Sequence, residues 1–101
     1  MDEMYRFQEW YAAQCDGDWE HEYGIRIETL DNPGWSVEID LTHSKLQLAT
    51  YTPVNNRTSE REWVRTWVDG KKFHGNGGPL MLATIIRHFS DWAAEVRRAA
   101  V

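Results

Sequence analysis

The sequence predicts an α+β fold with an N-terminal helix, a four- to five-stranded antiparallel sheet and a C-terminal helix, both helices being packed on one sheet face. Apolar residues recur at helical spacing near the two ends of the chain. Between these ends the spacing changes to an alternation of period two, which is typical of half-buried strands. The 101 residues leave room for one domain, so we expect a single unit over residues 1–101.

The first predicted helix spans Asp2 to Cys15. Its apolar side chains lie three or four positions apart, and the polar residues between them are left for water. Asp2 can cap the start of the helix, and Asp16-Gly17 is a typical stop. Cys15 lies on the apolar stripe, where we expect a small buried hydrophobic residue rather than a catalytic thiol.

A β-hairpin is predicted where two alternating runs, residues 23–29 and 35–41, flank the segment Leu30 to Gly34. Proline followed by glycine between two such runs is a strong turn signal. We expect Gly34 to take a positive φ, because the chain must turn back into the second strand there.

The register of this hairpin can be predicted from charge. A three-residue loop would place Glu28 opposite Glu38, and like charges that face each other destabilise a ladder. A five-residue loop places Arg26 opposite Glu38 instead, and this is the register that we expect. Its other pairs are Thr29 with Trp35, Ile27 with Val37 and Ile25 with Ile39.

Further strands are predicted in the second half of the chain. Leu46 to Tyr51 is expected to form the third strand, and the polar segment from Thr52 to Arg61 a loop. Glu62 to Val68 alternates again and is expected to form the fourth strand, with Trp63 and Trp67 on the same face.

The C-terminal part predicts a turn, a short strand and a helix. Asp69-Gly70 indicates a tight turn into a fifth strand at residues 71–73. The glycine-rich run from Gly75 to Gly78 is expected to be a flexible linker. Pro79 fits the first turn of the last helix, whose apolar stripe continues from Leu82 to Val96.

Composition limits the classes of function. Sixteen acidic and eleven basic residues give a formal net charge of −5, which argues against a nucleic-acid partner and suits a basic protein. No apolar run approaches the about 20 residues of a membrane span, and the start is acidic, so we expect a soluble, cytoplasmic protein without a signal peptide. A single cysteine fits a reducing compartment. Six tryptophans leave two interpretations open, a tryptophan-rich core or an aromatic surface for a partner.

The acidic run Asp16, Asp18, Glu20 and Glu22 is the strongest candidate for chemistry. Its carboxylates could bind a hard cation, but the glycine and glutamate positions of a calcium loop are not in place. We expect an extended segment whose acids share one solvated side, with no catalytic residue, metal site or cofactor. A small metal-dependent hydrolase that uses Asp16 to Glu22 is the alternative function, and a structural adaptor is a third.

Several short runs together resemble a known family. They are Gln14-Cys15-Asp16-Gly17-Asp18-Trp19, Tyr23-Gly24-Ile25, Asn32-Pro33-Gly34-Trp35, Phe73-His74-Gly75 and Phe89-Ser90-Asp91-Trp92. The family that they resemble is immunity protein 53. The resemblance implies a bacterial immunity protein of a polymorphic toxin system, which neutralises a cognate toxin domain in the cytoplasm by binding it. It implies no catalytic residues, and an acidic inhibitor suits the basic surfaces of toxins that are nucleases.

We expect the toxin to bind the face of the hairpin that is turned away from the helices. The apolar positions 23, 25, 27, 37 and 39 are expected to face the helices, which leaves an outer face with acids tempered only by Arg26. Either the tryptophans or the valines of the 62–68 strand would add an apolar centre. The alternative is that this face is only solvated. The expected partner-binding residues are Asp16, Asp18, Glu20, Glu22, Glu28, Glu38, Asp40, Trp63 and Trp67.

Overall fold

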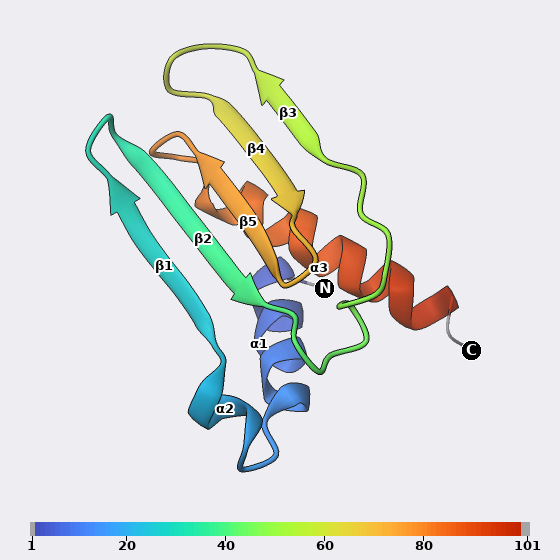
Figure 1. Ribbon diagram of the computed structural model, residues 1–101. Coiled ribbons are helices and arrows are strands. Elements are labelled where there is room, and N and C mark those ends of the chain that lie inside the picture. The colour runs from blue at the N-terminus through green and yellow to red at the C-terminus, as the bar shows by residue number, and fades with distance from the viewer. Residues whose placement is uncertain (1, 100–101) are drawn as a thin grey trace.

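The chain forms a five-stranded antiparallel sheet with two long helices on one of its faces (Figure 1). The computed structural model describes residues 2–99. The helices are α1 (Glu3–Gln14), α2 (Trp19–Glu22) and α3 (Leu82–Ala99), and the strands are β1 (Ile25–Leu30), β2 (Gly34–Asp40), β3 (Val54–Arg57), β4 (Trp63–Val68) and β5 (Lys72–Gly77). The strand order across the sheet is β1-β2-β5-β4-β3, so the predicted α+β class is confirmed. None of the helices in the described part is long and apolar enough to cross a membrane.

The first predicted helix is confirmed as α1, and its ends are as expected. The Asp2 carboxylate accepts a hydrogen bond from the backbone N–H of Met4 at 3.1 Å, which satisfies one of the free donors of the first turn. Cys15 is the C-cap, and its N–H donates to the carbonyl of Ala12. Gly17 follows with a φ of 97°, a conformation that a side chain would strain.

An aromatic cluster joins the helices to the sheet. Phe89 on α3 is fully buried and lies in edge-on contact with Phe7 and Trp10 of α1 and with Phe73 of β5. Trp92, one helical turn further along α3, is 5% exposed and donates its indole N–H to the carbonyl of Thr50. Because Phe89 lies between all of these layers, α1 is held mainly through α3.

The hairpin has the register predicted from charge. Arg26 is opposite Glu38, and Ile27 is opposite Val37. Val37 is fully buried, as expected, but Ile27 is 41% exposed. Because it pairs with Val37, Ile27 is on the helix side of the sheet as expected. It stays exposed because β1 lies at the edge of the sheet, beyond the helices that cover its centre (Figure 1).

Gly34 was expected at positive φ, and this is also wrong, since among the described glycines only Gly17 and Gly70 have positive φ. Gly34 pairs with Leu30 and is already part of β2, so the turn itself is only residues 31–33. A Cβ on Gly34 would collide with the carbonyl oxygen of Gly77. The glycine is required by the close approach of two strands rather than by a turn.

The expected strand at residues 46–51 is wrong, because local side-chain hydrogen bonds hold this segment in turns. The Ser44 hydroxyl donates to the carbonyl of Leu41 at 2.7 Å and accepts from the N–H of Leu46 at 3.2 Å. Leu46 still reaches the core and is 2% exposed. The third strand, β3, lies instead inside the segment 52–61 that was expected to be a loop, and it pairs with β4.

The glycine-rich run is not a flexible linker, since Gly75 and Gly77 lie within β5, the central strand of the sheet. A Cβ on Gly75 would collide with Cγ2 of Ile85 on α3. The missing side chains let α3 approach the backbone of the strand. The helix begins at Leu82, three residues after Pro79, because a turn closed by the Met81 N–H and the Gly78 carbonyl comes first.

Candidate partner-binding surface

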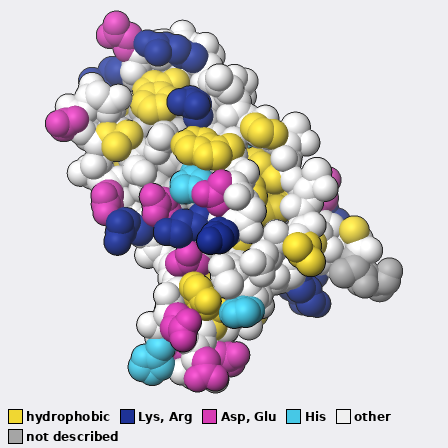
Figure 2. Space-filling view, viewed as in Figure 1, with side chains coloured by type: hydrophobic (Ala, Val, Ile, Leu, Met, Phe, Trp, Pro, Cys, Tyr) yellow, Lys and Arg dark blue, Asp and Glu magenta, His cyan; other side chains and the backbone are white. Residues whose placement is uncertain are grey.

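The outer face of the sheet is the face opposite α1 and α3. Because β5 lies between β2 and β4, the residues of five separate segments meet there. Acidic, basic and histidine side chains lie next to one another across the middle of this face, with hydrophobic side chains beside them (Figure 2). The side chains discussed below are Arg26, Glu28, Glu38, Asp40, Arg65, Trp67, Asp69, Lys72 and His74.

A stacked pair of rings forms the centre of the outer face. His74 of β5 lies opposite Trp67 of β4, with their ring centroids 5.1 Å apart and their planes 11° from parallel. The guanidinium carbon of Arg65 lies 5.4 Å from the Trp67 ring, in cation–π range. The imidazole Nε2 is 2.8 Å from Oδ2 of Asp69, in the turn between the two strands. Both rings are therefore held in one orientation by their neighbours.

Asp69 is the anchor of this arrangement. Partial burial alone would raise the pKa of its carboxyl group, but hydrogen bonds from the His74 side chain and from the backbone N–H groups of Lys71 and Lys72 outweigh burial and lower the pKa to about 2. The side chain is therefore a carboxylate at neutral pH, which accepts from the turn and from the imidazole together.

The acids of the outer face are largely paired. Lys72 Nζ lies 3.5 Å from Oε1 of Glu38 and 4.0 Å from Oδ1 of Asp40. Asp40 Oδ2 also accepts from the backbone N–H of Gly24 at 2.9 Å, so this carboxylate helps to fix the start of β1. Arg26 is thus not the only cation on this face, contrary to expectation, because the longer β5 brings Lys72 beside β2.

The tryptophans of the fourth strand are on the outer face, which settles the alternative that the sequence left open. Val64 and Thr66 are almost fully buried toward the helices, whereas Trp63 and Trp67 are half-buried on the opposite face. Trp19 and Trp92 are core residues, as a tryptophan-rich core would require.

The acidic run is not extended, contrary to expectation, but forms a turn followed by α2. Asp16 Oδ1 accepts hydrogen bonds from the N–H groups of Asp18 and Trp19, and Glu20 accepts from those of Asp16 and Gly17. The bonds from Trp19 and Asp18 lower the pKa of Asp16. Trp19 is buried by this turn, and its indole N–H donates to Thr42. Two of the four acids therefore act as hydrogen-bond acceptors of the fold.

No group of three or more histidine, cysteine, aspartate or glutamate side chains within residues 2–99 is placed to hold a metal ion. The outer face has only one histidine close to a carboxylate, the pair of His74 and Asp69. The imidazole of this pair is also stacked on the Trp67 ring.

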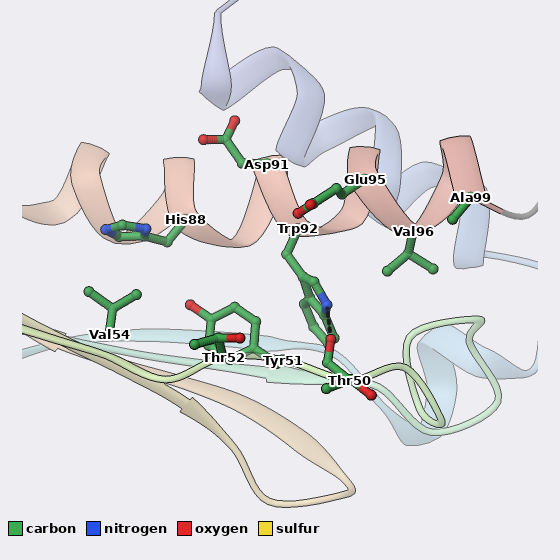
Figure 3. A pocket seen from close by; sticks show the side chains of 10 residues that line it. All are labelled: Thr50, Tyr51, Thr52, Val54, His88, Asp91, Trp92, Glu95, Val96 and Ala99. Atoms are coloured by element: carbon green, nitrogen blue, oxygen red, sulfur yellow. Dashed lines mark hydrogen bonds between the residues drawn. The ribbon is translucent and has the colours of Figure 1, made fainter.

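A groove of about 420 Å³ lies on the other side of the molecule, between α3 and the segment that leads into β3 (Figure 3). Trp92 points from the helix toward the strand side, where it meets Thr50 and Tyr51. Two polar side chains of its lining have partners within the chain, since Asp91 binds Arg6 at 2.7 Å and Tyr51 bonds Thr66. Burial, with the nearby Arg87, lowers the pKa of His88.

A family model described as Immunity protein 53 matches residues 4–94, which is most of the chain. The chain belongs to the immunity protein 53 family. This confirms the resemblance that was drawn from short sequence runs. No curated protein and no solved structure matches the chain. The matched range includes the whole sheet, and therefore every residue of the outer face in this immunity protein 53 family member.

The partner-binding residues expected from the sequence did not include four residues of the outer face: Arg65, Asp69, Lys72 and His74. Phe73-His74-Gly75 was recognised as a family run, but the fifth strand was expected to end at residue 73. The alternation of β5 places Lys72, His74 and Asn76 on one face, and this signal could have found the first two.

Proposed function

We propose that this protein neutralises a cognate toxin by binding it in the cytoplasm of the bacterium that produces the toxin, without catalysis or a cofactor. Membership of the immunity protein 53 family supports the immunity role. The partner is a protein rather than a nucleic acid or a membrane, and a net charge of −5 favours a basic toxin domain such as a nuclease.

The surface that we propose for binding is the outer face, and the ring pair of Trp67 and His74 is the observation that carries it. Aromatic residues in the middle of a charged rim are the usual anatomy of a tight protein interface. The pair is oriented in advance by Arg65 and Asp69, which lowers the entropy lost on binding. We propose the same role for Trp63, Glu28, Glu38 and Asp40 on this face, and a peripheral one for Asp16, Asp18, Glu20 and Glu22.

The test is co-expression with the toxin domain encoded beside this gene, combined with measured affinities. We expect Trp67→Ala to weaken binding at least about 30-fold, the size of an interface hot spot, and to abolish rescue of growth. Tyr5→Ala is the matched control, because Tyr5 is an aromatic residue that is 53% exposed on α1.

Circular dichroism must show that the Trp67→Ala protein is folded. Equal affinities of the two variants would place the interface elsewhere on the molecule. Failure of the unmodified protein to bind the toxin or to rescue growth would contradict the proposed function itself.

A further inference from the structure

We infer that the free edge of β1 pairs with β1 of a second copy of this chain, which joins the two sheets into one. This inference does not depend on the proposed function. It starts from a difference between the two edges of the sheet, since β1 and β3 each have one hydrogen-bonded neighbour among the described strands. Edge strands usually carry features that prevent pairing with another chain.

The β3 edge has such features. The strand is four residues long, it directly follows Pro53, and it presents the exposed polar residues Asn55, Asn56 and Arg57. The β1 edge shares only the exposed polar side chains, at Arg26, Glu28 and Thr29. It is six residues long, contains no proline, glycine or lysine, and leaves Ile27 41% exposed. An edge of this kind is prepared to accept a further strand.

The backbone of β1 has free donors and acceptors that face outward. In an antiparallel ladder, residues that exchange hydrogen bonds with the neighbour alternate with residues that do not. Asp40 donates its N–H to the carbonyl of Gly24 at 3.0 Å, so the even-numbered positions bond to β2. The N–H and C=O groups of Ile25, Ile27 and Thr29 therefore point away from the sheet.

One register satisfies two-fold symmetry and charge together. If the axis passes beside Ile27, this residue faces its own copy, and Arg26 lies opposite Glu28 of the second copy, twice. A shift of two residues either way would place Arg26 opposite Arg26 or Glu28 opposite Glu28, and both are repulsive. Arg26 and Glu28 already interact within one strand at 3.4 Å, with 70% and 60% of their side chains exposed, so both are free to turn toward a neighbour.

The expected dimer is weak. A six-residue edge buries less than the about 1,200 Å² of the smallest stable interfaces, so we expect a dissociation constant of about 10 μM to 1 mM. This affinity can be measured by sedimentation velocity of the purified chain without any toxin. Failure of this inference is therefore distinguishable from failure of the proposed function.

Charge exchange tests the register. Arg26→Glu would place glutamates opposite each other and should weaken the dimer at least about tenfold. The double variant Arg26→Glu with Glu28→Arg restores opposite charges in the same register and should recover the affinity of the unmodified chain. Arg57→Glu, which reverses an exposed arginine at the β3 edge, is the matched control and should change nothing.

Each result decides the inference. A chain that stays at its monomer mass of 11.9 kDa up to about 1 mM overturns it. So does a dimer that Arg26→Glu leaves unchanged, or one that Arg57→Glu weakens equally. A folded double variant that remains monomeric overturns the register. The inference is supported if Arg26→Glu weakens the dimer and the double variant recovers the affinity of the unmodified chain.

Discussion

At the scale of single residues, His74 shows how neighbours give a side chain its role. Its ring would be an ordinary surface histidine on an isolated strand. In the folded chain Trp67 covers one face of the ring, and Asp69 holds its Nε2, which leaves the side chain only 19% exposed. The imidazole is thereby fixed in position by two residues of the preceding strand and turn.

The first prediction concerns Asp69 and acid stability. Its pKa is about 2 in the folded chain and close to 3.8 when unfolded, so its contribution is fully present above pH of about 4 and is lost as the pH falls through about 2. Because the side chain is 48% exposed, screening reduces this contribution to about 1 kcal/mol or less.

Asp69→Asn should therefore lower the free energy of unfolding at pH 7, and the difference from the unmodified protein should shrink toward pH 2. Urea unfolding at several pH values measures both. A difference that stays constant over this range would contradict the assigned hydrogen bonds.

At the scale of elements, close contacts between neighbouring backbones decide where glycine is needed. Gly34 of β2 lies close to the backbone of Gly77 in the neighbouring strand β5. Gly75 of β5 lies close to the side chain of Ile85 on α3. These glycines lie in strands, where glycine is otherwise unfavourable. Their cost is offset by the packing of a helix and a strand at distances that no side chain would permit.

The second prediction follows from this contact. Gly34→Ala should destabilise the fold by about 1–3 kcal/mol, because its Cβ would collide with the carbonyl oxygen of Gly77 and push two strands apart. Gly24→Ala is the matched control, since nothing lies within 4 Å of a Cβ at Gly24 and its φ is not positive. Thermal unfolding of both variants measures the effect, and equal melting temperatures would show that the strands separate without cost.

At the scale of the whole molecule, net charge and local charge differ. The chain carries −5 in total, yet the outer face has basic groups beside its acids. Total charge acts on a partner at a distance, whereas the paired groups act only at contact. The net charge should therefore govern the rate of encounter, and the rings should govern the lifetime of the complex.

The third prediction tests this division. Glu28→Lys with Glu38→Lys raises the net charge from −5 to −1, since each reversal adds two units, and should slow association with a basic toxin about tenfold at low salt. The matched control is Glu9→Lys with Glu95→Lys. It raises the net charge by the same amount, but at exposed positions of α1 and α3.

The rates are measured by stopped-flow mixing at low and high ionic strength. If the outer face binds the toxin, the first pair should slow association more than the second, and the difference should fall as salt is added. Equal rates for both pairs would mean that the toxin does not approach this face.

The sequence by itself determined the parts of this protein that depend on near neighbours. Periodicity and capping were sufficient for α1 and α3, and the repulsion of Glu28 and Glu38 was sufficient for the register of β1 and β2. The family could also be identified from short runs of residues, and the family match over residues 4–94 confirms it. These features were predictable because the interactions behind them join residues close together in the chain.

Only the tertiary structure decided which strands lie next to one another. β5 pairs with β2 across more than thirty intervening residues, and this long-range contact turns glycines that look like a linker into a central strand. The position of β5 between β2 and β4 also places His74 beside Trp67 and Lys72 beside Glu38. The composition of the outer face could therefore not be predicted. The pairing depends on how α3 packs against β4 and β5, and burial of that kind leaves no local pattern for a reader of the sequence to find.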